Sequence, residues 1–116
     1  MTLNLLDKNT MAKFQLGQLV RHRMYDFRGV VYDVDPNFSQ TDEWYQAIPA
    51  DVRPSKDQPF YHLFAENPDK STYNAYVSEQ NLVPDRDDEP IEHPELGEFF
   101  EEFDNGTYKL RRELAN

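Results

Sequence analysis

Five short segments in the first 84 residues of the chain are rich in strand-forming residues, and in several of them the side chains alternate between two faces, a pattern that predicts β-strands. β-branched and aromatic side chains are frequent in these segments, and residues that favour turns separate them. The segments are residues 18–22, 30–34, 60–64, 71–78 and 82–83. The pattern therefore predicts a mainly β fold of about five strands.

Two glycines mark positions where this fold must bend. Gly17 precedes the first predicted strand and Gly29 precedes the second. Gly29 is expected at a bulge or tight bend, where the missing Cβ permits a positive φ or a close backbone approach. Five short strands with such a bend predict a small SH3-like barrel, in which closure protects the strand edges.

A long loop, interrupted by prolines, covers residues 37–59. Loops of this length in so small a domain are usually functional or mobile. Within it, residues 41–46 are expected to form one helical turn with Thr41 as its N-cap. Trp44 and Tyr45 lie in this turn, where they either fold the loop back over the barrel or present an anchor to a protein partner.

The composition changes after Pro84, where an acidic linker begins. A short amphipathic helix of about two to three turns is expected after Pro94, because apolar residues recur at helical spacing. These residues are Leu96, Phe99, Phe100 and Phe103. A helix this short is not stable alone in water, so it must pack on the barrel or on another chain, which leaves a homo-oligomer open. The expected organisation is a mobile arm (1–11), a barrel (12–84) and an acidic linker with a C-terminal helix (85–116).

The charge of the chain is acidic and unevenly distributed. The net charge is −10, and residues 85–116 hold 4 basic and 11 acidic residues against 8 and 11 in residues 1–84. This field repels phosphate backbones and anionic membranes, so nucleic-acid binding would need a local basic patch. The sequence has no cysteine, no signal peptide and no apolar run of membrane-spanning length, so we expect a cytoplasmic protein with no membrane partner.

Motifs for catalysis or for a cofactor are absent from the sequence, which has neither a Gly-rich phosphate loop nor a nucleophile elbow. His22 and His62 could meet across adjacent strands with Asp33 and hold a metal, but no ligand spacing supports this, and ordinary structural histidines are favoured. Asp33 and Asp35 point to one face and could act as an acid–base pair, although an Asp-x-Asp-Pro segment more often caps a turn. The acidic residues 85–89 are interpreted as a solvated linker. We therefore expect no enzyme, no metal and no cofactor.

The concentrated positive charge of the barrel comes from Arg21, Arg23 and Arg28. Arg21 and Arg23 share a strand face, and Arg28 lies across the turn. With Tyr25 and aromatic neighbours, this cluster could bind phosphate and stack on a base. It could equally pair with the aspartates of the second strand or with the acidic tail, and the residues alone leave both alternatives open.

Several blocks of residues, in the same order, resemble the HspQ family of small bacterial heat-shock proteins, whose domain is also called YccV-like or hemimethylated-DNA-binding. The resemblance covers about residues 12 to 84. The matching blocks are Phe14-x-Leu16-Gly17-Gln18-x-Val20-Arg21-His22, Arg28-Gly29-Val30-Val31-x-Asp33-Val34-Asp35-Pro36, Trp44, Pro59-Phe60-Tyr61-His62 and Tyr76-Val77-Ser78-Glu79-Gln80-Asn81-Leu82.

This resemblance implies a barrel without a catalytic centre and two kinds of activity. The first is modulation of an ATP-dependent protease of the Lon type, as an adaptor in protein quality control and the stress response. The alternative is binding of hemimethylated DNA, with an effect on the replication initiator. The expected partners are thus the protease and its substrates, or DNA. The candidate contact residues are Arg21, His22, Arg23, Arg28, Trp44, Tyr45, Tyr61 and His62.

Overall fold

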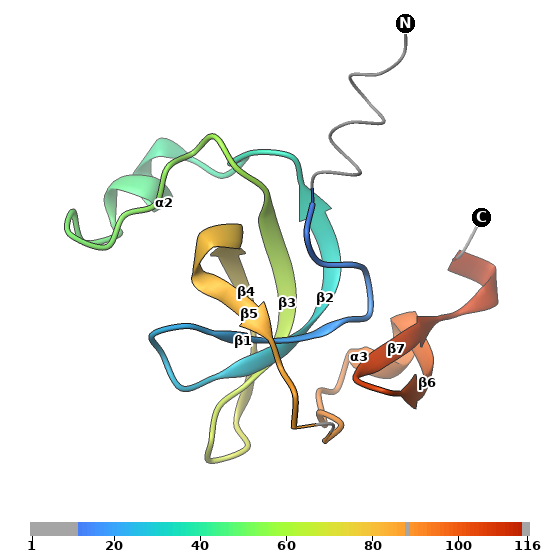
Figure 1. Ribbon diagram of the computed structural model, residues 1–116. Helices are drawn as coiled ribbons and strands as arrows, with labels where there is room; N and C mark the ends of the chain where they lie inside the picture. The colour runs from blue at the N-terminus through green and yellow to red at the C-terminus, as the bar shows by residue number, and fades with distance from the viewer. Residues whose placement is uncertain (1–11, 88, 115–116) are drawn as a thin grey trace, which may run out of the picture.

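The computed structural model describes residues 12–87 and 89–114, and its architecture is mainly β (Figure 1). A five-stranded sheet has the strand order β4-β3-β2-β1-β5, and a separate hairpin is formed by β6 and β7. All neighbouring strands are antiparallel. The strands of the large sheet are β1 (Leu19–His22), β2 (Arg28–Asp35), β3 (Phe60–Glu66), β4 (Thr72–Ser78) and β5 (Leu82–Pro84).

The mainly β prediction and its five strands are confirmed, but the sheet is not closed into a barrel. β4 and β5 are its two edges, joined by a single 3₁₀ turn, η1 (Glu79–Asn81). β5 has only three residues and ends at Pro84, which has no N–H to donate to a further strand. Its pairing partners all lie on β1. The predicted closure therefore fails at the short fifth strand.

Gly29 and Tyr32, three residues apart in β2, are the positions where this strand departs from a regular ladder. A Cβ on Gly29 would lie 3.0 Å from the Leu63 Cβ and 3.0 Å from the Phe64 carbonyl oxygen, so β2 and β3 approach closely there. The register between β2 and β3 shifts between Val31 and Asp33, which places the bulge at Tyr32 rather than at Gly29. A bulge increases the local twist, and it bends this long strand.

The predicted C-terminal helix is wrong beyond its first turn. α3 (Leu96–Phe99) has four residues, and the chain then continues as β6 (Phe100–Asp104) and β7 (Thr107–Leu110). Asn105 and Gly106 link these strands with φ values of 53° and 76°, as an Asn-Gly hairpin turn requires. Of the four apolar residues spaced for one helix face, Leu96 and Phe99 lie in α3, whereas Phe100 and Phe103 lie in β6. The chain closes with a 3₁₀ turn, η2 (Arg112–Leu114).

The sheet has a hydrophobic core on each face. Neighbouring residues of a strand point to opposite faces, so Val20 belongs to the first core and Leu19 to the second. The second face is covered by the segment after the sheet, drawn in orange and red in Figure 1. The first core contains Phe14, Val20, Val31, Tyr61, Leu63, Val77 and Leu82. The second contains Leu19, Val30, Phe64, Ile91, Leu96, Phe100 and Tyr108.

The backbone of the C-terminal hairpin is attached directly to the start of β1. The Tyr108 N–H donates to the Gly17 carbonyl over 2.7 Å, and the Leu19 N–H donates to the Gly106 carbonyl over 3.0 Å. Gly17 has a φ of +88° at this contact. The hairpin is therefore part of the same folded unit as the sheet.

The long loop carries the expected helical turn, α2 (Asp42–Gln46), capped by Thr41, whose Oγ1 accepts from the Trp44 N–H over 3.1 Å. The predicted arm of residues 1–11 lies outside the described residues. None of the helices in the described part of the chain has the length and apolar character needed to cross a membrane.

Candidate functional site

The antiparallel pairing of β1 with β2 brings the predicted arginines together. Arg21 and Arg28 are direct cross-strand partners, and Arg23 follows β1 in the turn. We call these three residues the arginine face. The side chain of Arg21 is 45% exposed and that of Arg28 only 12% exposed. Arg23 is exposed and makes no ion pair within the part of the chain that the structure describes.

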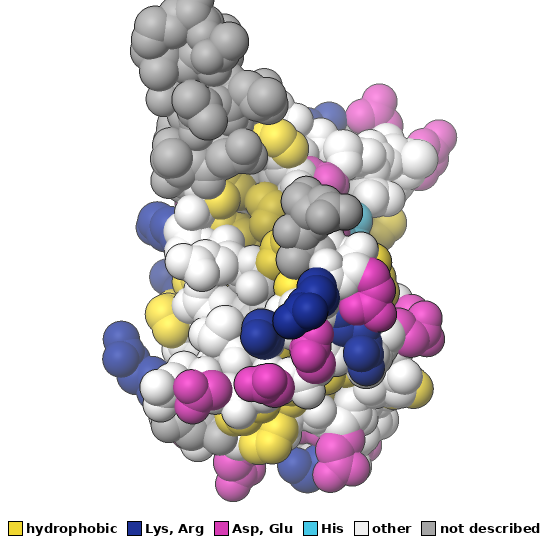
Figure 2. Space-filling model, turned by 90° about the vertical axis from the view of Figure 1, so that its right-hand side faces the viewer, with side chains coloured by type: hydrophobic (Ala, Val, Ile, Leu, Met, Phe, Trp, Pro, Cys, Tyr) yellow, Lys and Arg dark blue, Asp and Glu magenta, His cyan; other side chains and the backbone are white. Residues whose placement is uncertain are grey.

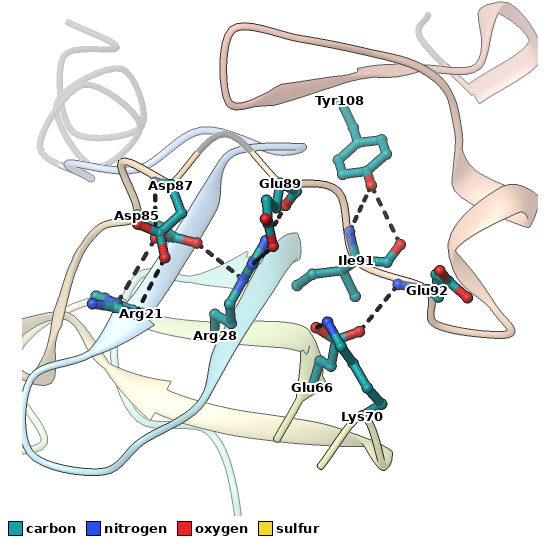
Figure 3. A network of polar contacts seen from close by, with 10 residues as sticks. All are labelled: Arg21, Arg28, Glu66, Lys70, Asp85, Asp87, Glu89, Ile91, Glu92 and Tyr108. Atoms are coloured by element: carbon teal, nitrogen blue, oxygen red, sulfur yellow. Dashed lines mark hydrogen bonds and ion pairs between the residues drawn. The ribbon is translucent and has the colours of Figure 1, made fainter. Parts of the chain in front are cut away.

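Acidic residues of the segment after β5 lie on the arginine face (Figure 3). Asp85 is central: its Oδ2 lies 3.0 Å from the Arg28 Nε, and its Oδ1 lies 3.8 Å from the Arg21 Nε. The Asp87 Oδ2 lies 3.7 Å from the Arg21 Nη2. Glu89 contacts Arg28 through its carboxylate and accepts a hydrogen bond at its carbonyl oxygen. Of the two alternatives, the acidic tail therefore supplies the partners of the arginines in this structure.

The interpretation of this segment as a solvated linker is wrong for Asp85. Its side chain is fully buried, and its backbone N–H donates to the Leu19 carbonyl over 3.0 Å. The Arg28 Nε and the Asp85 Oδ2 form an ion pair at 3.0 Å. Neither atom has a hydrogen-bond partner, so the two are not aligned as a hydrogen bond. Among the described residues that pair with the arginines, Asp87 and Glu89 are 59% and 71% exposed and are solvated counter-charges.

The exposed arginines line an open hollow of about 580 Å³ at the turn after β1. It is lined by Arg21, Arg23, Tyr25 and Asp26, among others, and the ring of Tyr25 is 57% exposed. On the side of the molecule shown in Figure 2, basic and acidic side chains lie next to one another and do not form one continuous positive field. The positive patch is therefore small and local.

His22 shapes the turn that carries Arg23. It is 8% exposed, and its Nδ1 accepts hydrogen bonds from the backbone N–H groups of Met24 and Tyr25, each over 3.0 Å. Burial, followed by the charge of Arg23, lowers the pKa of His22 below its ordinary value. A neutral ring with an accepting Nδ1 fits both observations. His22 is thus positioned to hold the turn, and it offers little surface to a partner.

His62 lies with Asp35 and not with His22. The His62 Nε2 is 3.0 Å from the Asp35 Oδ2, and the same oxygen accepts from the Ser39 and Tyr76 hydroxyls over 2.6 and 2.8 Å. Asp33 accepts from the Val34 N–H over 2.9 Å. Ligand atoms of Asp33, Asp35 and His62 come within 4.8 Å of one another, but three donors already surround the central oxygen. The arrangement favours the turn-capping interpretation of the two aspartates.

Replacing Asp35 by asparagine is expected to lower the free energy of unfolding at pH 7 by about 2 kcal/mol, since hydrogen bonds to a charged group contribute on this order. Burial alone would raise the pKa of Asp35, but the bonds from Ser39, Tyr76 and His62 hold it below the ordinary 3.8. A lowered folded-state pKa gives stability that is present above the unfolded value and is lost as pH falls through the folded one.

Urea unfolding between pH 7 and about pH 2 measures this effect, and the wild type should lose more stability below about pH 4 than Asp35→Asn. Asp33→Asn is the matched control, because Asp33 is exposed and bonds only to the next residue. Parallel stability curves for the wild type and Asp35→Asn would contradict the assignment.

Tyr61 is a core residue with 0% exposure and has no surface to offer a partner. Its hydroxyl donates to the Glu79 carboxylate over 2.6 Å and accepts from the Phe14 N–H over 3.3 Å. Burial and the bond to Glu79 raise the pKa of Tyr61 far above its ordinary value. We therefore remove Tyr61 from the contact surface expected from the sequence.

Trp44 and Tyr45 differ in their roles. The Tyr45 hydroxyl donates to the Pro54 carbonyl over 2.6 Å, and the Lys56 Nζ lies 4.6 Å from its ring centroid, so Tyr45 stabilises the loop. The ring of Trp44 packs edge-on against the ring of Tyr76, with their centroids 5.4 Å apart. Trp44 as a whole is 38% exposed. Trp44 thus both fixes the loop over β4 and leaves part of its ring accessible.

This accessible part of Trp44 belongs to a groove of about 410 Å³ between the long loop, β4 and the turn after β1. We call it the aromatic groove. None of the residues that line it is Lys, Arg, Asp or Glu. Sequence reasoning missed it, although tyrosines on both faces of β4 were a visible signal. Its walls include Tyr25, Trp44, Pro49, Pro54, Tyr73 and Tyr76.

The fold and these two surfaces define a small, mainly β domain with a local basic patch and an uncharged groove. The family described as "Hemimethylated DNA-binding protein YccV like" matches residues 12–107, so the chain belongs to the YccV-like family, as the resemblance indicated. The match extends through most of the C-terminal hairpin, beyond the residues on which the resemblance rested.

Among curated proteins, the chain is similar to F-box only protein 21 of Pongo abelii and to that of Homo sapiens. Each is 28% identical over 109 residues, which is 93% of this chain and 17% of the relative. The chain thus spans about a sixth of the length of these relatives. The comparison with solved structures gave no match.

Proposed function

We propose that this chain is a non-enzymatic, cytoplasmic binding domain that holds hemimethylated duplex DNA through the arginine face. The observation that carries the proposal is the exposure of Arg21 and Arg23, which line one open hollow at the end of β1. The description of the matching family supports the same ligand. No cofactor is needed for this activity.

The acidic segment after β5 competes with DNA phosphates for the arginines. Phosphates that approach Arg21 compete with Asp87, whose contact is 3.7 Å long and exposed to water. Such surface pairs contribute little, about 0–1 kcal/mol, so a phosphate can replace them. Arg28 and Asp85 are buried and stay paired, so Arg21 and Arg23 are the expected phosphate contacts. Since the net charge is −10, binding must be weak and must decrease steeply with salt.

Replacing Arg21 or Arg23 by alanine is expected to weaken binding to a hemimethylated duplex and to reduce the salt slope by about 1 for each lost phosphate contact. Fluorescence anisotropy with hemimethylated, fully methylated and unmethylated duplexes measures this. Lys109→Ala is the matched control, because it removes one exposed positive charge from β7 and should change affinity least.

The variant Asp87→Asn is expected to bind DNA more tightly than the wild type, because it neutralises the carboxylate that competes with phosphate for Arg21. Equal affinity for all three duplexes at low salt, or an Arg21→Ala variant that binds like the wild type, would overturn the DNA proposal. A gain of Asp87→Asn that is matched by Glu101→Gln, which removes one acidic charge elsewhere, would show a general field effect and would contradict local competition.

A second proposal is modulation of an ATP-dependent protease of the Lon type, favoured by the uncharged aromatic groove around exposed Trp44. Its partners would be the protease and its substrates. Degradation by the purified protease, with and without this protein, is the test, and Trp44→Ala should lose the effect. Unchanged turnover of every substrate, together with no binding to the protease, would overturn it.

A further inference from the structure

The outer edge of β4 carries backbone groups that no described strand pairs. The Glu79 N–H donates to the Pro59 carbonyl and the Asn67 N–H donates to the Ser71 carbonyl, which fixes the hydrogen-bonding phase between β3 and β4. Since antiparallel pairs alternate, Tyr73, Ala75 and Val77 direct their N–H and C=O groups towards β3. The backbone groups of Thr72, Asn74, Tyr76 and Ser78 therefore point away from the sheet.

Over residues 72–76 this edge has none of the sequence features that protect exposed strands from pairing, whereas its end at Ser78 is buried, with 2% exposure. Natural edge strands are shortened, charged, bulged or interrupted by proline. β4 has seven residues, Thr72–Ser78, none of them charged and none proline, and its register with β3 is continuous. The opposite edge, β5, is only three residues long and ends at Pro84. Only one edge of the sheet is thus open to a further strand.

The open edge lies in the aromatic groove. Residues 73–78 of β4 line it, Tyr73 is 38% exposed, and Trp44 stands on the loop side with a similar exposure. The groove volume of about 410 Å³ is in the range of small-molecule and side-chain pockets. Backbone donors and acceptors therefore run beside apolar walls that could take alternate side chains of an added strand.

We propose that the β4 edge and the aromatic groove bind an extended, uncharged apolar segment of another protein, which adds to the sheet as a strand beside β4. The absence of charged residues from the groove lining favours this occupant. No charged residue lines the groove of a chain that is 29% charged, so neither a phosphate backbone nor a charged peptide finds a partner there. The unpaired edge requires an extended backbone, because a helix uses its own N–H and C=O groups. This inference deepens the protease proposal by naming the chemistry of a bound substrate, and it is independent of the DNA proposal.

The test is binding of a fluorescent, capped heptapeptide of alternating phenylalanine and threonine to the full chain, with amide NMR shifts as the second readout. The wild type should bind with shifts at residues 72, 74 and 76. Asn74→Pro removes an outward N–H without removing a bond to β3, and it should weaken binding by about tenfold or more. Asn74→Ala is the matched control and should bind like the wild type.

Trp44→Ala provides a second variant that keeps the strands intact, and it should weaken binding by about tenfold. A peptide with N-methyl groups on alternate residues should fail to bind, since it lacks the donors of a strand. No binding by the wild type, NMR shifts outside β4 and the groove, or an Asn74→Pro variant that is folded and binds normally would each overturn the proposal.

Two other results separate this site from its alternatives. A dimer in sedimentation that Asn74→Pro dissociates, with no peptide binding, would show that the occupant is a second copy, which overturns the proposal. If the peptide binds but the protease assay shows no effect, the groove proposal stands and the protease proposal fails. The DNA proposal is tested with Arg21→Ala and does not depend on whether the peptide binds. Each proposal can therefore fail separately.

Discussion

Replacing Gly17 by alanine is expected to lower the free energy of unfolding by about 3 kcal/mol or more, the range of the most disruptive single substitutions. A Cβ at this position would lie 2.1 Å from the Tyr108 carbonyl oxygen, which is backbone and cannot rotate away. The φ of +88° adds strain that only glycine avoids. The hairpin must therefore move away from β1, which exposes Leu19 and Phe100 of the second core.

Urea unfolding measures this loss, and Gly97→Ala is the matched control. A Cβ at Gly97, within α3, meets no atom within 4 Å, so its effect should be neutral or stabilising by up to about 1 kcal/mol. The loss in Gly17→Ala should be accompanied by NMR shifts in β7. If both glycine variants had the same stability, the close contact between Gly17 and Tyr108 would be refuted.

Replacing Asp85 by alanine is expected to cost about 3 kcal/mol, because removal of one partner from a buried ion pair leaves the other charge uncompensated. Arg28 is only 12% exposed and lies 3.0 Å from this carboxylate. The loss should persist at 1 M salt, since buried pairs are screened much less than surface pairs. Thermal and urea unfolding at low and high salt measure both properties.

Asp87→Ala is the matched control for Asp85→Ala. It removes an aspartate two positions away whose 3.7 Å contact is exposed, so the change should stay below about 1 kcal/mol. The double variant Asp85→Leu, Arg28→Met should recover much of the lost stability, because an apolar pair can replace a buried ion pair. An Asp85→Ala variant as stable as Asp87→Ala would contradict a structural role for this ion pair.

The five strands could be predicted from the sequence because their signals are local. Strand-forming residues along β1 to β4, and prolines such as Pro36 after β2 and Pro59 before β3, are visible within a few residues. The C-terminal segment could not be assigned, since Leu96, Phe99, Phe100 and Phe103 fit a helix face as well as a turn followed by a strand. The hairpin turn at Asn105–Gly106 and the docking at Gly17 decide the outcome, and the second of these is a tertiary contact.

The sequence predicted which charged residues of the site lie together, but not which of them are buried. The arginine cluster and its pairing with acidic residues follow from strand adjacency and opposite charge. Which members remain accessible depends on the segment that covers them, so the burial of Asp85 and the small exposure of Arg28 had no signal in the sequence. For the same reason the sequence predicts Tyr61 as a contact candidate although it is buried, because an aromatic strand does not show which residues face inwards.

The position of the second core in the chain has a consequence for synthesis. The described residues that cover the second face of the sheet, from Ile91 to Tyr108, follow all five strands in the sequence. A nascent chain that has just completed β5 would display Leu19, Val30 and Phe64 to water until the hairpin has left the ribosome. Contacts between distant parts of a chain form late, and the exposed apolar surface is prone to aggregation meanwhile. The ribosome-bound form of this protein thus exposes, for a short time, apolar surface of the kind that chaperones shield.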